Sequence, residues 1–272
     1  DFQKVMATFS NVRSHSAAEN MVDFLSTHPS TPQRVDLALG HARKAGPRPA
    51  PSEEDRNVYL AGINGLLYGD TSEEGFVRDQ TYLHSDLGIS FTFPGGFNIE
   101  NRSASVVGSR ESDGAAIRFD GVDVDDNMAL TSYLASGWVE GLDMASIQAA
   151  SINGSPAAIA KAQVGTWSFD ITVVRANGQV YRILTAVPTA GAPVEPLAAS
   201  ARESFRTLSD AERASLRPLR IEIVRASATD TAASMALKLE GVQKSERFFR
   251  ALNGLTATEP LVAGRAYKTI VE

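Results

Sequence analysis

The chain has 272 residues, of which 43% are hydrophobic and 21% are charged, and this balance is typical of a globular protein rather than a disordered or membrane-embedded one. Its formal net charge of −6 argues against a nucleic-acid partner, because nucleic-acid-binding proteins gather Lys and Arg to neutralise phosphates. The absence of cysteine excludes disulfides, thiol catalysis and thiolate metal sites. No apolar run approaches the roughly 20 residues that a membrane-spanning helix needs, so we expect no membrane span in this chain.

Residues 1–45 carry two helical patterns. Apolar residues recur at helical spacing between Phe2 and Phe9, which predicts a first helix. The segment Ser30-Thr31-Pro32-Gln33 combines a capping box with a proline in the first turn, so a second helix is predicted from Thr31 to Lys44. Two short helices bury too little surface to be stable alone. We therefore expect residues 1–45 to be the C-terminal helices of a larger domain.

A proline-rich segment follows these helices. Three prolines between Gly46 and Ser52 forbid a helix and predict an extended linker. A short helix is predicted after it, from about Arg56 to Leu67. Residues 46–79 are thus interpreted as a linker with a connecting helix.

Residues 80–212 have the pattern of an antiparallel sheet domain. The residues from Ile89 to Phe93 alternate between apolar and polar, as expected of a strand. Asn153-Gly154 and Asn177-Gly178 lie between strand-like runs and predict tight type I′ hairpins. Helices are predicted over Met128–Val139 and Val194–Leu208. The fold class is therefore α+β, with an antiparallel sheet covered by helices on one face.

Residues 213–272 are predicted to form a small βααβ unit. Its strands cover Arg220–Val224 and Ala266–Val271, and its helices cover Thr231–Leu239 and Ser245–Leu252. Asn253-Gly254 after the second helix is a typical helix stop, because glycine adopts the left-handed conformation at little cost.

The segment from Phe24 to Arg34 resembles the His-Pro-containing segment that follows the active site in the CAAX prenyl protease and HtpX-like family of zinc metallopeptidases. In that family two His of an HExxH helix and a later Glu hold the zinc. This chain has no HExxH, so we expect it to be inactive alone, with zinc only in the full-length parent. The resemblance implies that His28 and Arg34 border the parent's cleft; alternatively, His28 shapes a turn and Arg34 makes a surface ion pair.

Two further resemblances cover the rest of the chain. The segment from Tyr59 to Gly69, continuing through Leu83 to Gly88, is similar to one that trails such peptidases in a bacterial envelope subgroup, and the sheet domain resembles PsbP, a fold used mainly for interaction. The last unit resembles a LysM module, which binds glycans that contain N-acetylglucosamine, such as peptidoglycan. The resemblance is carried by Thr229-Asp230-Thr231, Asn253-Gly254-Leu255, and Gly264 with Tyr267–Ile270. The glycan-binding residues that it implies are Thr229, Asp230, Thr231, Asn253 and Gly254. Thr229 stands where the module usually has Gly.

Two other kinds of chemistry have weaker patterns. The aspartates Asp120, Asp123, Asp125 and Asp126 offer oxygens to calcium, but they lack the fixed Gly and Glu positions of an EF-hand, so a solvated turn is the alternative. His84 and Asp86 resemble an orienting pair for acid–base catalysis, yet no nucleophile motif accompanies them, which favours a structural His84.

These observations lead to two hypotheses. In the first, the chain is the non-catalytic C-terminal part of a bacterial periplasmic zinc endopeptidase, and it targets the protease or presents its substrates. Its partners are then the upstream catalytic domain and peptidoglycan or envelope proteins. In the alternative, it is a stand-alone envelope scaffold that binds peptidoglycan through its C-terminal module.

Overall fold

The chain forms two compact units. The computed structural model describes residues 31–46, 52–242 and 244–272. One unit is Asp70–Arg217, called here the sheet unit; the other, the small unit, combines the described residues up to Gly69 with Pro218–Glu272. The sheet unit is thus inserted in the sequence of the small unit. The amide of Tyr68 donates to the carbonyl of Leu219 at 2.8 Å, so the chain leaves and re-enters the small unit at neighbouring points.

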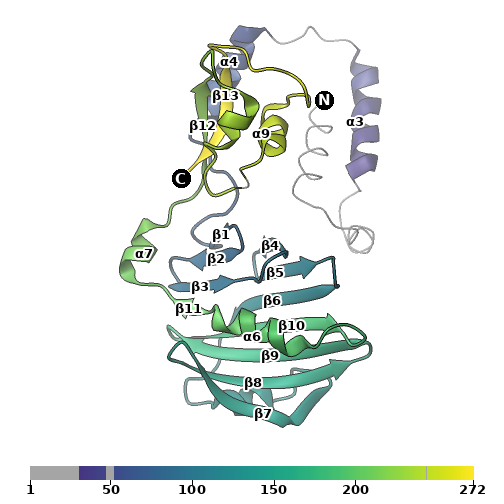
Figure 1. Ribbon diagram of the computed structural model, residues 1–272, viewed down its shortest axis with the longest axis vertical. Coiled ribbons are helices and arrows are strands. Elements are labelled where there is room, and N and C mark those ends of the chain that lie inside the picture. The colour runs from purple at the N-terminus through teal and green to yellow at the C-terminus, as the bar shows by residue number, and fades with distance from the viewer. Residues whose placement is uncertain (1–30, 47–51, 243) are drawn as a thin grey trace. The chain divides into compact units, whose positions relative to one another are not determined.

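The elements follow the chain in this order (Figure 1): α3 Thr31–Ala45, α4 Glu53–Ile63, β1 Phe76–Arg78, β2 Thr81–His84, β3 Ile89–Thr92, β4 Asn98–Arg102, β5 Ser105–Arg110, β6 Ala115–Val122, α5 Leu130–Leu134, β7 Leu142–Ile152, β8 Ser155–Val164, β9 Trp167–Ala176, β10 Gln179–Pro188, α6 Val194–Glu203, β11 Arg206–Thr207, α7 Asp210–Ser215, β12 Arg220–Arg225, α8 Ala232–Ala236, α9 Glu246–Asn253 and β13 Ala266–Val271.

Two antiparallel sheets form the sheet unit. The larger has seven strands in the order β4-β5-β6-β10-β9-β8-β7, and the smaller has four in the order β1-β2-β3-β11. Both predicted Asn-Gly hairpins are present, between β7 and β8 and between β9 and β10. Asn153 and Asn177 have φ of 48° and 50°, and each following glycine also has positive φ, as a type I′ turn requires. The prediction of an α+β fold with antiparallel sheets is confirmed.

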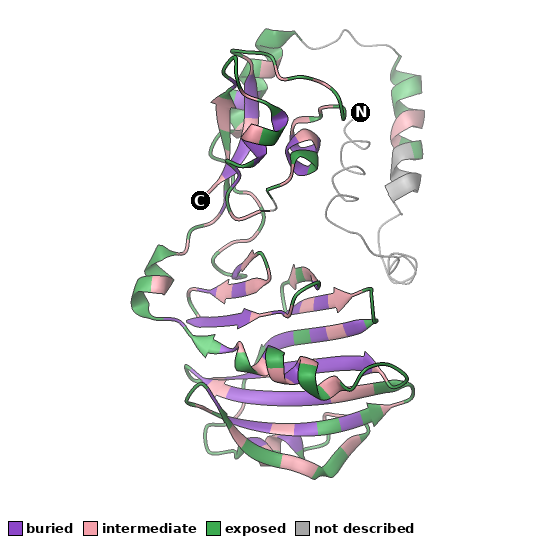
Figure 2. Cartoon of the chain, in the orientation of Figure 1, coloured by how far each residue is buried: buried purple, intermediate pink, exposed green. Residues whose placement is uncertain are grey.

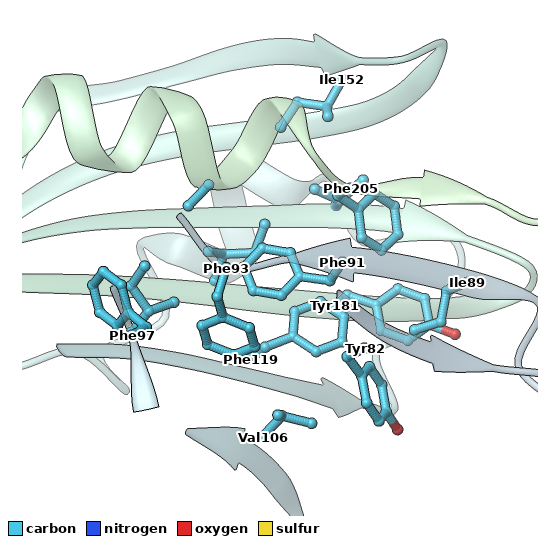
Figure 3. Close-up of a cluster of buried hydrophobic side chains, with 14 of the residues drawn as sticks. Tyr82, Ile89, Phe91, Phe93, Phe97, Val106, Phe119, Ile152, Tyr181 and Phe205 are labelled. Carbon is cyan, nitrogen blue, oxygen red and sulfur yellow. The ribbon is translucent and has the colours of Figure 1, made fainter. Parts of the chain in front are cut away.

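The main core of the sheet unit contains residues from both sheets. Phe91 of β3 stacks on Phe119 of β6 with ring centroids 4.6 Å apart, and Phe119 stacks on Tyr181 of β10 at 5.8 Å. Ala201 of α6 and Phe205 belong to the same buried cluster. Figure 2 shows β3 as mostly buried and β6 as a mixture of buried, intermediate and exposed residues. Stacked aromatic pairs such as these (Figure 3) add stabilisation beyond the area they bury, so the register of β3, β6 and β10 is strongly specified.

The two helices of the sheet unit that pack on the large sheet lie on opposite faces, so the prediction of helices on one face was wrong. Successive side chains of a strand point to opposite faces. On β9, Ile171 and Val173 pack in the cluster that contains α5, whereas Val174 packs in the cluster that contains α6. Because both faces of the central strands are apolar, both need cover. In the sequence, the continuous apolar run of β9 already indicated that both faces of this strand are buried.

Both of these helices are also shorter than predicted. The predicted helix Met128–Val139 ends at Leu134, because Gly137 adopts φ of 91° and Trp138 folds back to donate its indole N–H to the carbonyl of Tyr133 at 3.0 Å. Helix α6 ends at Glu203 instead of Leu208. Its last turn is followed by Ser204, whose hydroxyl donates to the carbonyl of Thr92, and β11 then pairs with β3.

The small unit has the predicted βααβ order, with β12 and β13 paired antiparallel and α8 and α9 packed beside them. Helix α4 lies on the other face of this strand pair. Leu60 of α4 is buried and shares a cavity with Ile223 and Ala266, whereas Val224 and Tyr267, which point the other way, join the core of α8 and α9.

The segment predicted as a connecting helix is therefore an integral layer of the small unit. Helix α4 begins earlier than predicted because Ser52 and Asp55 form a capping box, and it ends at Ile63 rather than Leu67. The side-chain oxygen of Asn64 accepts from the amide of Ile223 at 2.9 Å, and Leu67 bridges Arg220 in antiparallel fashion. These contacts with β12 stop the helix.

Helix α3 spans Thr31–Ala45, which confirms the helix predicted from Thr31 to Lys44. The predicted helix between Phe2 and Phe9 lies outside the described residues. Within the described part of the chain, no helix is both long enough and apolar enough to cross a membrane.

Candidate functional site

Two loops of the small unit lie side by side at one end of the β12–β13 pair. The first loop, residues 226–231, follows β12, and the second loop, residues 254–265, precedes β13. The amide of Ala226 donates to the carbonyl of Arg265 at 3.0 Å, and the amide of Gly264 donates to the carbonyl of Ala226 at 2.7 Å. Antiparallel pairing of the strands thus brings together two segments that are far apart in sequence.

The first loop is organised by Asp230. Its carboxylate accepts from the amide of Ser227 at 2.7 Å and from the ammonium of Lys238 at 3.1 Å. The Ser227 amide, with help from Lys238, lowers the pKa of Asp230 to about 2, so this group is ionised at neutral pH. Thr231 caps α8 in a reciprocal pair with Ser234. Among the predicted residues of this loop, Thr229 and Thr231 are exposed.

Asn253 and Gly254 occupy the point where α9 passes into the second loop. The side-chain amide of Asn253 donates to the carbonyls of Phe249 and Lys268 at 3.1 and 3.0 Å, and its oxygen accepts from the amide of Lys268 at 2.7 Å. Gly254 has φ of 66° and ends the helix. The side-chain amide of Asn253 therefore joins α9 to β13. This structural role explains an asparagine at this position without a bound ligand.

The second loop is held by Arg250, which the sequence pattern did not single out, and by Tyr267, which belongs to the closing strand of the LysM resemblance. The guanidinium of Arg250 donates to the carbonyls of Thr256 and Glu259 at 2.9 and 2.7 Å. The hydroxyl of Tyr267, which is fully buried, accepts from the amide of Val262 at 2.9 Å. These hydrogen bonds link side chains to the backbone of an irregular loop, and no local sequence pattern predicts such bonds.

The two loops therefore meet, but the contact between them is not made by the five predicted residues. The backbone of Ala226, Gly264 and Arg265 makes the junction. Of the predicted cleft residues, His28 lies outside the described residues, and Arg34 lies within α3 but its side chain is not among those described.

The two weaker patterns from the sequence find structural explanations. The carboxylate of Asp120 is held by Arg118 at 2.7 Å and by Arg182 at 2.6 Å. Across the part of the chain that the structure describes, no three His, Cys, Asp or Glu residues are grouped to hold a metal ion. The ring of His84 is buried, which lowers its pKa, and its Nδ1 accepts from the amide of Leu87 at 3.3 Å.

Fold and site together define a two-unit α+β chain in which an antiparallel sheet unit is inserted into a small unit with two adjoining loops. No protein-family model matches this chain, and no curated protein matches it. A protein of Bacteroides thetaiotaomicron VPI-5482, with a crystal structure at 1.50 Å resolution, is 12% identical with a TM-score of 0.39, over 60% of this chain and 58% of its own length. The cyanobacterial PsbP (CyanoP) of Synechocystis sp. PCC 6803, a solution structure, is 15% identical with a TM-score of 0.36, over 51% of this chain and 98% of its own.

The chain spans little more than half of the Bacteroides protein.

Proposed function

We propose that this chain is the non-catalytic, binding part of a periplasmic zinc-dependent endopeptidase, and that its small unit binds the glycan strands of peptidoglycan through the loops 226–231 and 254–265. The observation that supports glycan binding is the direct hydrogen bonding between the two loops at Ala226 and Gly264. A LysM-like module uses the corresponding loops to form its glycan groove.

Rigid loops favour binding, because the free energy that would order a mobile loop is not needed. In the second loop, Arg250 and Tyr267 fix the backbone before any ligand arrives. The exposed hydroxyls of Thr229, Thr256 and Thr258 are donors and acceptors suited to sugar hydroxyls and acetamido groups. The loops thus present polar groups on a fixed backbone.

The assignment to a protease rests on the segment from Phe24 to Arg34, which resembles a segment of the HtpX-like zinc metallopeptidases. In this proposal an upstream domain of the same polypeptide holds the zinc, His28 and Arg34 border its cleft, and the sheet unit is a PsbP-like interaction domain. Tethering the protease to the envelope raises the local concentration of its substrates. The rival is a stand-alone scaffold that binds peptidoglycan.

The coding sequence upstream distinguishes these two. The protease hypothesis expects an open frame that encodes HExxH and a later Glu ligand, whereas the scaffold hypothesis expects a start codon close to Asp1. Metal-dependent proteolysis by the chain on its own would contradict the assignment as non-catalytic.

Sedimentation of the full chain with purified peptidoglycan tests the glycan site. Thr229→Glu places an extended, charged side chain on the exposed first loop and is expected to reduce the pelleted fraction strongly. The matched control is Val58→Glu, which adds the same charge on α4, where Val58 is 69% exposed. Equal pelleting of both variants and the unchanged chain would refute the loops as the binding site.

A chain truncated at Leu216 is a poor control for this experiment. Removing β12 and β13 would expose Leu60 of α4, which those strands cover. Point variants avoid this damage because they leave the layers of the small unit intact.

A further inference from the structure

The small unit contains a cavity of about 320 Å³ between α4 and the β12–β13 pair. Its floor is formed by the buried side chains of Leu60 and Ala266 and by the half-buried Ile223. Its other lining residues are all exposed, namely Asn57, Ala61, Asn64 and Arg225. Sites for small molecules start at roughly 300 Å³, so this cavity is large enough for a small ligand that approaches from solvent.

Asn64 presents hydrogen-bond donors to this cavity. Its side-chain oxygen accepts from the backbone amide of Ile223 at 2.9 Å. This bond fixes which end of the carboxamide is the oxygen, because a backbone amide is able only to donate. The NH₂ group of Asn64 is therefore left for a ligand, and a ligand that accepts hydrogen bonds fits it.

Arg225 adds a fixed guanidinium to the same cavity. Its Nη1 donates to the carbonyl of Gly264 at 2.8 Å, and this bond orients the side chain from the end of β12. Among the described residues, no carboxylate forms an ion pair with Arg225. A guanidinium has five N–H donors in a planar fork, which matches the two oxygens of a carboxylate.

The charges around the cavity favour an anion. None of the described residues that line it is Asp or Glu. Lys268 lies opposite Ile223 on β13 and shares its face of the strand pair. Burial lowers the pKa of Lys268, and the nearby Arg56 lowers it further, because one positive charge disfavours another. A carboxylate at this face would relieve that repulsion.

The remaining lining residues suit the end of a peptide. The carboxamide of Asn57 forms no hydrogen bond with the described residues, and it offers both a donor and an acceptor, as a peptide group requires. Ala61 and Ile223 supply accessible apolar surface beside these polar groups. This surface is small, so it fits a methyl group better than a large ring.

We propose that this cavity binds the C-terminal carboxylate of a short peptide that ends in a small apolar residue such as alanine. Arg225 and Asn64 donate to the carboxylate, Asn57 pairs with the preceding peptide group, and the methyl group contacts Ala61 and Ile223. The site contains none of the residues predicted to bind glycan, so it goes beyond the proposed function.

Three probes test the proposal by NMR titration of the full chain. The first is N-acetyl-alanyl-alanine, the second is its C-terminal amide, and the third is inorganic phosphate. The acid is expected to shift the methyl signals of Ala61 and Ile223 and to bind roughly tenfold or more tightly than the amide, as expected for a charge-assisted hydrogen bond. Phosphate is expected to bind more weakly than the acid, because it has no apolar group. No probe contains a sugar, so the result is separate from glycan binding.

Two variants and one control test the donors. Arg225→Gln is expected to weaken binding of the acid roughly tenfold or more. Asn64→Asp keeps an oxygen for the amide of Ile223 but replaces the donor with a negative charge, so it is expected to abolish the preference for the acid over the amide. The matched control is Arg220→Gln, because Arg220 is also exposed on β12 and donates to a backbone carbonyl, that of Gly65 at 2.7 Å, but does not line the cavity.

The control variant is expected to bind the acid as the unchanged chain does. The proposal is overturned if the acid and the amide bind equally, if phosphate binds as tightly as the acid, or if the acid shifts signals elsewhere but not those of Ala61 and Ile223. It is also overturned if Asn64→Asp retains the preference for the acid, or if Arg220→Gln weakens binding as much as Arg225→Gln does.

Discussion

The buried carboxylate of Asp170 makes the stability of the sheet unit depend on pH. Asp170 lies on β9, is 1% exposed, and pairs with Arg202 of α6 at 3.1 Å. Its Oδ2 has no partner among the described residues. Burial raises the pKa of Asp170 to about 6; Arg202 opposes this shift, and the nearby Glu195 reinforces it. The folded state therefore holds this proton more tightly than the unfolded state does.

The size of this pH effect on the free energy of unfolding follows from the linkage between protonation and folding. The pKa of Asp170 rises from 3.8 to about 6 on folding. Stabilisation by this proton is complete below about pH 3.8 and is lost as the pH rises through about 6. Each unit of pKa difference between the folded and unfolded states is worth about 1.4 kcal/mol, so the free energy of unfolding falls by about 3 kcal/mol over this pH range.

Asp170→Asn tests this reasoning, because an amide resembles the protonated carboxyl at every pH. Near pH 4 the variant is expected to match the unchanged chain, and at pH 7.5 it is expected to be more stable by up to about 3 kcal/mol. Urea unfolding followed by tryptophan fluorescence measures this, since Trp138 and Trp167 both lie in the sheet unit. Asp123→Asn, on an exposed residue, is the control. A difference that stays constant between pH 4 and pH 7.5, or a less stable variant at pH 7.5, would refute the reasoning.

Three further substitutions test other contacts. Asp120→Ala leaves Arg118 and Arg182 without the carboxylate that is only 2% exposed, so the free energy of unfolding should fall by about 3 to 5 kcal/mol in urea titrations; a loss below about 1 kcal/mol would contradict a buried ion network. Asn253→Ala removes the link between α9 and β13 and should lower the stability of the small unit by about 1 to 3 kcal/mol, measured by amide hydrogen exchange; unchanged protection would argue against that link. Thr269→Val removes a buried hydroxyl without a partner among the described residues and should stabilise the small unit by about 1 kcal/mol in the same assay, whereas destabilisation would indicate a partner such as a bound water.

Local signals in the sequence predicted most of the secondary structure. Asn153-Gly154 and Asn177-Gly178 fixed two hairpins, because asparagine and glycine tolerate the positive φ that the turn demands. The βααβ order of residues 220–271 also followed from pattern. These features depend on neighbours in the chain, which a sequence displays directly.

The candidate sites were less accessible from the sequence. The pattern located the two loops through Thr229–Thr231 and Asn253-Gly254, but it did not predict that the side-chain amide of Asn253 joins α9 to β13. No sequence pattern predicted that the hydroxyl of Tyr181 would be buried without a hydrogen-bond partner among the described residues. Whether a polar group has a partner depends on contacts across distant strands, and no local pattern encodes them.

By itself, the sequence determined the α+β class, the two Asn-Gly turns and the helix stop at Gly254, because each depends on the conformational preferences of a few adjacent residues. Only the tertiary structure decided that α4 is a layer of the small unit, that α5 and α6 cover opposite faces, and that Asn64 and Arg225 line one cavity. These outcomes depend on which apolar faces bury one another, and many pairings of faces satisfy the same pattern along the chain.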